Sequence, residues 1–284
     1  MVEHQDNTAQ IAYWNDRAAI TWTAFQERMD ALFEPLTSVA LDAAAPVLGE
    51  QVIDVGSGCG ATVLALGERV GPSGGVLGLD VSLPMAARAN ERIAALGLAN
   101  AQVIVSDAAT HEFARPRFDL LFSRFGVMFF ADPVAAFANL RRGMRPGGRL
   151  LCVAWRALTD NPWFNVPLAA ASGFLQQQAP VDAGAPGPFA FADADRTRGI
   201  LSDAGWIDAD LARRDVPMQF AGSGEIAQAT EFATRVGPLA RILAEESAET
   251  SARIRQAVAD ALSTYDSPAG ISLLGSVWLI SARA

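Results

Sequence analysis

The feature of this sequence that most constrains its fold is a regular alternation of short apolar runs and amphipathic segments after residue 50. A run that is followed by a helix and then by another run indicates a parallel βαβ unit. The alternation therefore predicts an α/β protein with a Rossmann-like, doubly wound sheet. The runs occupy residues 51–56, 75–80, 101–107, 118–123 and 148–155, and the helical patterns between them lie near 61–70, 84–97 and 134–143.

Two later apolar runs, residues 207–220 and 271–283, are predicted to complete a seven-stranded sheet. We expect three parts in the chain. Residues 1–49 form an N-terminal helical lid, and residues 50–156 form the cofactor-binding core. Residues 157–284 supply the rest of the core together with helical insertions that cap the substrate.

The predicted lid has its apolar residues at helical spacing over residues 8–45. Asn7 and Thr8 offer an N-cap for the first helix. Pro35 and Pro46 are expected to interrupt the helical pattern, because proline lacks the backbone N–H that a helix interior needs.

Charge and composition exclude several classes of function. The net charge of −9 argues against a nucleic-acid partner, because phosphate contacts need a dense basic surface. All 22 basic residues are arginine, so a lysine-dependent phosphate loop and Schiff-base catalysis are both excluded. The two cysteines, Cys59 and Cys152, lie far apart, and histidine occurs only at His4 and His111. We therefore expect neither a metal site nor a disulfide framework.

Targeting signals are also missing from the sequence. No stretch approaches the roughly 20 apolar residues that span a bilayer. The first ten residues, MVEHQDNTAQ, have neither the basic nor the apolar region of a secretory signal. We expect a cytoplasmic protein without a membrane span, and the sequence leaves open whether it forms a homodimer.

The strongest local motif is the glycine-rich turn VIDVGSGCGA at residues 52–61, where an apolar strand runs into a helix. Glycine is required where a backbone turns sharply or where a ligand comes too close for a Cβ. The following helix N-terminus offers unpaired N–H groups to an anionic group. The turn also fits the dinucleotide fingerprint GxGxxG/A, so by itself it does not distinguish two adenosine cofactors.

Acidic residues follow the next two strands. Asp80 ends the second strand, where a carboxylate would accept both hydroxyls of a ribose. Asp107 ends the third strand, where a carboxylate could accept a hydrogen bond from the amino group of adenine. The glycine turn and Asp80 fit NAD and S-adenosylmethionine equally well, whereas the addition of Asp107 favours S-adenosylmethionine.

With these motifs the sequence resembles class I S-adenosylmethionine-dependent methyltransferases, especially the small-molecule group akin to quinone-biosynthesis methyltransferases. The resemblance covers about residues 50–155. It continues through FDLLFSRFGVMFFADP at residues 118–133 and RPGGRL at residues 145–150. It implies that S-adenosylmethionine is the cofactor.

The resemblance also implies roles for individual residues. The methionine part of the cofactor would lie at Asp54 and the glycine turn, and Asp80 would bind ribose. Val81 and Met85 would pack on adenine, whose amine would meet Asp107 near the Ala108 N–H. The segment after the fourth strand would lie beside the sulfonium. The implied cofactor residues are Asp54, Gly56, Gly58, Gly60, Asp80, Val81, Met85, Asp107, Ala108, Ser123 and Trp22.

One departure from the sequence pattern of these methyltransferases narrows the class of acceptor. Methyltransferases that act on planar amino nitrogens carry an Asn/Asp-Pro-Pro-aromatic stretch after the fourth strand, whereas this chain has SRFG at residues 123–126. We therefore expect methyl transfer to the oxygen or carbon of a small molecule rather than to nitrogen. Aromatic residues in the predicted cap favour a hydrophobic or aromatic acceptor. They are Trp163, Phe164, Phe174, Phe189, Phe191 and Phe232.

Some residues near the predicted site have both a functional and a structural interpretation. Tyr13, Trp14 and Trp22 are candidate lid residues, although aromatic residues at this spacing also pack as helix core. Arg124 could orient an acceptor carboxylate or phenolate, or form an ordinary salt bridge. His111 is a weak candidate for a general base, because it follows Asp107 on the adenine side.

Two other functions stay open. A nicotinamide-dependent oxidoreductase would use the same glycine turn and Asp80. A non-catalytic protein that binds S-adenosylmethionine would keep the whole cofactor site without transferring a methyl group, because one fold serves many activities.

Overall fold

The computed structural model describes residues 7–175 and 184–284. The chain divides into two compact units. Unit 1 comprises Met1–Trp155, Ala183–Arg214 and Val277–Ala284, and unit 2 comprises Arg156–Asp182 and Asp215–Ser276. Residues 176–183 of the predicted cap, residues 1–6 and the candidate His4 lie outside the described residues.

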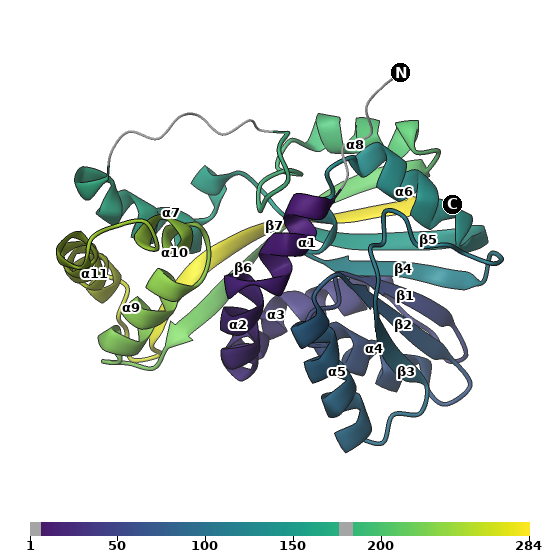
Figure 1. The fold of residues 1–284 in the computed structure, drawn as a ribbon, viewed down its shortest axis with the longest axis horizontal. Coiled ribbons are helices and arrows are strands. Elements are labelled where there is room, and N and C mark those ends of the chain that lie inside the picture. Colours follow the sequence, from purple (N-terminus) through teal and green to yellow (C-terminus); the bar gives the residue numbers. More distant parts are fainter. Residues whose placement is uncertain (1–6, 176–183) are drawn as a thin grey trace. The chain divides into compact units, whose positions relative to one another are not determined.

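A seven-stranded sheet in the order β3-β2-β1-β4-β5-β7-β6 organises the fold, as the alternation of apolar runs predicts (Figure 1). Strands β1 to β5 pair in parallel, and β7 joins β5 antiparallel. The sheet is therefore mixed, and the prediction of an α/β Rossmann-like sheet is confirmed. Its strands are β1 Gln51–Val55, β2 Gly75–Asp80, β3 Ala101–Val105, β4 Phe118–Arg124, β5 Met144–Trp155, β6 Ile207–Ala221 and β7 Ile271–Arg283.

The strand order reverses beside β1. Along the chain, β1 to β3 step outward to one edge, and β4 then returns to the other side of β1. Ile53 of β1 is in register with Leu77 of β2 and Leu121 of β4. The carboxyl ends of these strands therefore open at a topological switch point, which is where such sheets bind ligands.

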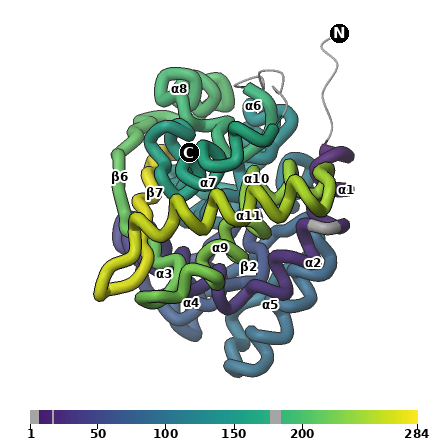
Figure 2. Tube along the Cα trace, turned by 90° about the vertical axis from the view of Figure 1, so that its left-hand side faces the viewer, coloured from purple at the N-terminus to yellow at the C-terminus, as the bar shows by residue number. Residues whose placement is uncertain are grey.

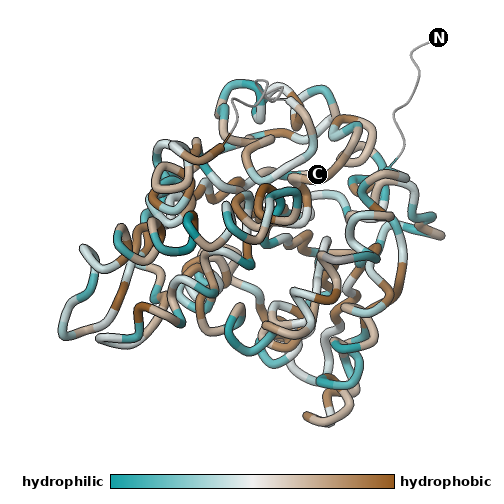
Figure 3. The backbone as a smooth tube through the Cα atoms, turned by 60° about the vertical axis from the view of Figure 1, so that its left-hand side comes forward, coloured by the Kyte–Doolittle hydropathy of each residue, from teal (hydrophilic) through white to brown (hydrophobic). Residues whose placement is uncertain are grey.

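Helices of unit 1 pack on this sheet. Helix α3 packs on β4 and β5, helix α4 on β1 to β3, and helix α5 on β2 and β3. Hydrophobic and hydrophilic residues alternate along the helical turns of the backbone (Figure 3). The helices of unit 1 are α1 Thr8–Asn15, α2 Arg17–Ala24, α3 Gln26–Ala44, α4 Ala61–Val70, α5 Leu83–Ala95, η1 Val127–Phe129, α6 Pro133–Arg142 and α8 Ala194–Asp203.

Helix α3 corrects the prediction about Pro35, which lies inside the helix and does not interrupt it. A proline in a helix interior costs about 3 kcal/mol. Burial of the neighbouring Phe33 and Leu36 offsets this cost, since each large apolar side chain removed from water contributes about 1.5–3 kcal/mol. The helix ends at Ala44, just before Pro46, and Ala45 takes a left-handed conformation with φ of 44°.

Unit 2 is a group of helices packed with the segments 215–221 of β6 and 271–276 of β7. Helix α11 packs on α7 and α9, and α10 packs on both as well (Figure 2). Asn161 fixes this unit internally, because its side-chain oxygen accepts the Ser276 N–H at 2.7 Å. The helices are η2 Leu158–Asp160, α7 Pro162–Ala171, η3 Ser172–Phe174, α9 Ile226–Arg235, α10 Pro238–Leu243 and α11 Ala248–Ser263. None of the helices in the described residues is long and apolar enough to cross a membrane.

Strand β3 forms one edge of the sheet, and a helix side chain covers its middle. The Val103 N–H and C=O point away from β2. Asn90 of α5 bonds both groups, because its amide donates to the Val103 oxygen at 2.8 Å and accepts the Val103 N–H at 3.0 Å. The amide thus satisfies two backbone groups that a further strand would otherwise pair.

We predict that Asn90→Ala lowers the free energy of unfolding by about 1–3 kcal/mol, because both backbone groups of Val103 lose their partner. Urea unfolding followed by circular dichroism measures this change. Glu91→Ala on the same helix is the control. Its ion pair with Arg88 is exposed, and its loss should cost less than about 1 kcal/mol. Equal losses in the two variants would contradict the structural importance of Asn90.

Candidate functional site

The glycine turn after β1 is built from left-handed backbone conformations. The φ angles are +69° at Gly56, +55° at Gly58 and +85° at Gly60, where residues with a Cβ are strained. Gly60 is also confined sterically, because a Cβ there would lie 2.9 Å from the Cβ of Ala89 in α5. Gly60 therefore packs directly against Ala89 of α5.

The segments that follow β1 and β4 are in contact at this turn through backbone atoms, with no side chain between them. A Cβ on Gly56 would lie 2.4 Å from the Cα of Gly126, and a Cβ on Gly126 would lie 2.4 Å from the oxygen of Val55. The preceding residue, Phe125, has a φ of +72°, which is strained for an aromatic residue. The ends of β1 and β4 thus approach as closely as the polypeptide allows.

Asp54 lies directly before the turn and is fully buried. One carboxylate oxygen accepts a hydrogen bond from Thr62 at 2.5 Å, and the other has no hydrogen-bond partner among the described residues. Burial raises the pKa of Asp54 to about 7, although the Thr62 hydrogen bond and the charge of Arg124 act in the opposite direction. A buried carboxylate with an unused oxygen is suited to a cationic or donating ligand group.

Asp80 at the end of β2 fixes the shape of the turn. Its carboxylate accepts the Gly58 N–H at 2.7 Å and the Ser82 N–H at 2.8 Å. Burial raises the pKa of Asp80, and these backbone hydrogen bonds counteract the shift. Asp80, which is predicted to bind the ribose, therefore also links the ends of β1 and β2.

Asp107 follows β3 and meets the start of the lid. The Asn7 amide donates to both oxygens of Asp107, at 2.9 and 3.0 Å, and its own oxygen accepts the Ala131 N–H at 2.8 Å. The prediction that the Asn7 side chain caps the first helix is wrong. Asn7 occupies the N-cap position of α1 but makes no capping hydrogen bond, because its side chain is committed to these partners.

The other predicted adenine contacts lie on the same segments. The Val81 carbonyl accepts from the Asn15 side chain at 2.8 Å. Met85 is buried, and its Cε lies 3.2 Å from the position of a Cβ on Gly58. Ala108 is buried as well, and Asn139 donates to its carbonyl at 3.2 Å. Met85 thus covers the glycine turn, while Ala108 is tied to α6.

Ser123 and Arg124 occupy the end of β4. The buried Ser123 hydroxyl donates to the Val55 carbonyl at 2.7 Å and accepts the Val127 N–H at 3.3 Å, so it joins β4 to β1. Arg124 donates to the Thr37 hydroxyl of α3 at 2.5 Å, and its guanidinium lies 5.3 Å from the ring centre of Phe33. Within the described residues Arg124 forms no salt bridge to a carboxylate. Burial lowers its pKa, the nearby charges of Asp30 and Asp54 act in the opposite direction, and the arginine stays protonated.

The lid aromatics form a connected cluster with the core. Trp14 contacts Tyr13, Trp22 and Phe129 edge-on, with ring centres 5.0–5.8 Å apart. Trp22 is stacked against Phe33 at 6.2 Å. Phe33 contacts Phe125, which stacks on Trp155 at 4.3 Å. Aromatic rings thus run continuously from the lid to the end of β5.

His111 lies apart from this cluster, in an open cleft on the connection between β3 and β4. Its Nδ1 is 3.0 Å from the Ser106 hydroxyl, and burial lowers its pKa. The cleft is lined by Thr110, His111, Glu112, Phe113, Ala114, Asn139 and Arg142. Within the described residues, no group of three or more His, Cys, Asp or Glu side chains is arranged to hold a metal ion.

Several residues of the site are absent from the sequence-based prediction. Arg92 of α5 donates to the Cys59 carbonyl at 2.5 Å and pairs with Asp30 of α3 at 2.7 Å, which ties the lid to the glycine turn. Asn15 and Arg92 belong to no recognisable motif. Gly126 does carry a signal, because a glycine directly after an aromatic residue at a strand end suggests a close backbone approach.

The residues around the glycine turn fit an adenosine cofactor that carries an amino-acid part. Buried polar atoms without a partner among the described residues surround it, namely one Asp54 oxygen and the hydroxyls of Ser57 and Ser82. At Gly58 only the flexible end of Met85 approaches the Cβ position. Unused polar atoms beside open backbone are what a polar ligand requires.

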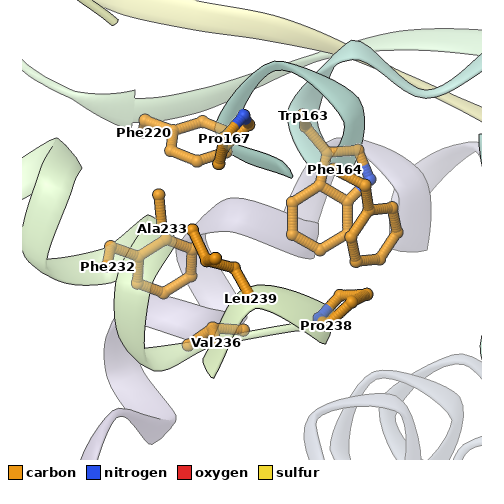
Figure 4. Close-up of a pocket in the computed structure, with 9 residues that line it drawn as sticks. All are labelled: Trp163, Phe164, Pro167, Phe220, Phe232, Ala233, Val236, Pro238 and Leu239. Atoms are coloured by element: carbon orange, nitrogen blue, oxygen red, sulfur yellow. The ribbon is translucent and has the colours of Figure 1, made fainter. Parts of the chain in front are cut away.

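Unit 2 contains a separate, apolar pocket. Side chains from α7 and from the α9–α10 segment point toward one another around it (Figure 4). Aromatic, proline and aliphatic residues line the pocket, so its walls are mainly apolar. The lining residues are Trp163, Phe164, Pro167, Phe220, Phe232, Ala233, Val236, Pro238 and Leu239.

Comparison with known proteins agrees with this geometry. Residues 52–148 match a family described as methyltransferase domain. The aklanonic acid methyltransferase DauC of Streptomyces sp. strain C5 is 36% identical over 118 residues, which cover 42% of this chain and 54% of DauC. A demethylmenaquinone methyltransferase of Bacillus cytotoxicus is 32% identical over 105 residues, which cover 37% of this chain and 44% of that protein. The chain thus spans about half the length of the curated relatives it matches.

A solved structure supports the fold. The YcgJ protein of Bacillus subtilis superposes with a TM-score of 0.57 at 17% identity, over 87% of this chain and 97% of that one. The family match identifies residues 52–148 as a methyltransferase domain, and the superposition supports the fold. The predicted resemblance to class I S-adenosylmethionine-dependent methyltransferases of the quinone-biosynthesis type, and the predicted cofactor, are confirmed.

We predict that Gly126→Ala destabilises the protein by about 1–3 kcal/mol, because the new methyl group would overlap the Val55 carbonyl at 2.4 Å. Gly126 has a helical φ of −71°, which alanine adopts without strain, so the expected loss of stability comes from the steric overlap alone. Thermal unfolding measures it. Gly199→Ala in α8 is the control, because nothing lies within 4 Å of its Cβ position and alanine favours a helix. An unchanged melting temperature in Gly126→Ala would contradict the close approach.

The raised pKa of Asp54 predicts a distinct pH dependence of stability. An unfolded aspartate titrates near 3.8, whereas folded Asp54 holds its proton up to about pH 7. Between these values the folded state binds more protons, so the free energy of unfolding falls as pH rises from about 4 to about 7. The total loss is up to about 4 kcal/mol. Urea unfolding across this pH range should show the decline in the free energy of unfolding for the wild type and not for Asp54→Asn. The same pH dependence in both proteins would contradict the raised pKa of Asp54.

Proposed function

We propose that this chain transfers a methyl group from S-adenosylmethionine to a small-molecule acceptor. The observation that supports this most is the convergence of three strand ends at the switch point. The glycine turn with Asp54 follows β1, Asp80 ends β2 and Asp107 follows β3. Each element offers the polarity that one part of the cofactor would need.

The cofactor would lie along these strand ends. Asp54 would accept a hydrogen bond from its ammonium group through the oxygen that is unused, and the backbone of Gly56 to Gly60 would enclose its amino-acid part. Asp80 would face the ribose, and Asp107 with the Ala108 N–H would face adenine. Val81, Met85, Ser123 and Trp22 complete the proposed cofactor site.

S-adenosylmethionine supplies, when bound, a methyl carbon that its sulfonium has already activated. The chain then has to align the acceptor in line with that carbon and to exclude water. The aromatic cluster from Trp14 to Trp155 suits this task, because it is apolar and lies beside the end of β4. Such a mechanism requires no dedicated acid–base pair, so His111 needs no role in it.

We propose that the acceptor is hydrophobic or aromatic and carries an anionic group that Arg124 binds. Arg124 is partly buried and forms no salt bridge among the described residues, although the charges of Asp30 and Asp54 act on it, so its guanidinium can still pair with an anionic group. The ring of Phe33 beside it would contact an apolar acceptor body. Oxygen or carbon is the favoured methylated atom. The acidic net charge of −9 supports a partner other than nucleic acid, and we propose a cytoplasmic location.

Two measurements test the proposed function. Isothermal titration calorimetry with S-adenosylhomocysteine and with NADH should give binding of the first ligand alone. Transfer of a tritium-labelled methyl group from S-adenosylmethionine should occur with some members of a panel of phenols, carboxylic acids and quinol analogues. Binding without any transfer would indicate a non-catalytic protein, and binding of NADH in its place would indicate an oxidoreductase.

Among acceptors that are methylated, anionic ones should depend on Arg124. We predict that Arg124→Met raises KM for anionic acceptors about tenfold, the cost of one charge-assisted hydrogen bond, and leaves neutral acceptors nearly unaffected. Arg124→Lys, which keeps the charge and loses the planar fork, should have an intermediate KM. An equal rise in KM for anionic and neutral acceptors would show that Arg124 does not bind the anionic group of the acceptor.

A further inference from the structure

Two asparagine side chains fasten helix α1 to unit 1, one at each end of the helix. Asn7 bonds Asp107 and the Ala131 N–H, as described above. Asn15 donates to the Val81 carbonyl at 2.8 Å and accepts the Leu83 N–H at 2.9 Å. Helix α1 therefore bridges the segments that follow β2 and β3, which are the segments proposed to hold adenosine.

The hydrogen bonds to Asp107 leave its carboxylate one acceptor position. An ionised carboxylate has about four lone-pair positions. Asn7 donates to both oxygens, and the Ala109 N–H donates to Oδ1 at 2.9 Å. Three positions are thus occupied, and the fourth is on Oδ2. Because Asn7 is buried and its own oxygen is bonded to Ala131, the carboxylate cannot rotate without breaking these contacts.

We propose that Asn7 is a positioning residue that aims the remaining acceptor position of Asp107 at the 6-amino group of the cofactor's adenine. The inference rests on the proposed function, and it assigns purine selectivity to the lid. A 6-aminopurine would donate a hydrogen bond to the oriented oxygen. A 6-oxopurine would present an oxygen to the same carboxylate and be repelled.

The position of Asn7 also determines when this selection operates. Asn7 directly precedes α1, so its amide reaches Asp107 only while the helix is docked. Asn15 holds the opposite end of the same helix and supports the docked arrangement. The proposed recognition of the purine therefore requires helix α1 in this docked position.

The test compares two ligands that differ only at the purine 6-position, S-adenosylhomocysteine and S-inosylhomocysteine. Calorimetry on the full chain should show that the wild type prefers the amino form by at least about tenfold, the worth of one hydrogen bond to a charged group. Asn7→Ala should reduce that preference to about threefold or less. Gln10→Ala is the matched control, since it removes an amide from the same helix that takes part in none of the contacts above, and it should keep the wild-type preference.

Further variants separate positioning from folding. Asn7→Ser, which is too short to span both oxygens of Asp107, should behave as Asn7→Ala does, and circular dichroism verifies that each variant is folded. Asp107→Asn should abolish the preference, and adding Asn7→Ala to it should cause no further loss. Equal weakening of both ligands by Asn7→Ala, or tighter binding of the amino form, would overturn the proposal. Failure of the wild type to bind either ligand would instead overturn the proposed function.

Discussion

The structure depends on the contact between two backbones that have no side chains at the point of closest approach. Gly56 after β1 and Gly126 after β4 meet where the strand order reverses. Any Cβ would separate the two strand ends and widen the switch point. Ser123 reinforces the contact through its hydrogen bond to Val55. The left-handed Phe125 then directs its ring onto Trp155, so the conformation of one loop sets both the cofactor turn and the aromatic cluster.

A second set of interactions ties the N-terminal helices to this centre. Arg92 is bonded both to the glycine turn and to Asp30 of α3, and Gln26 accepts hydrogen bonds from Arg88 of α5. Asn7 and Asn15 attach α1 farther along the same rim. The lid is therefore fixed to the same backbone segments that are proposed to bind the cofactor. The position of these helices and the shape of the proposed cofactor site are therefore set by the same contacts.

Periodic patterns explain why so much of this fold is predictable from sequence. The limits of α4 and β1 agree closely with the pattern, because buried apolar runs and glycines mark them locally. The position of Asp80 at the end of β2 follows from the same reasoning, whereas β3 ends at Val105 and Asp107 lies just beyond it. Local propensity mispredicts Pro35, because it ignores the burial of Phe33 and Leu36. The contacts of Asn7 were not predictable, because they join residues 100 and 124 positions apart and leave no periodic trace.

The hydrogen bonds between Asn90 and Val103 bear on how copies of this protein can associate. A parallel sheet with an open edge can grow by adding a strand from another molecule, which leads to fibres as readily as to dimers. Strand β3 is only five residues long, and its central backbone groups are already occupied by a side chain of its own molecule. Continuation of the sheet across this edge is therefore hindered at its centre. A homodimer that used this edge would have to be built from side-chain surfaces, where shape and charge can limit assembly to a closed pair.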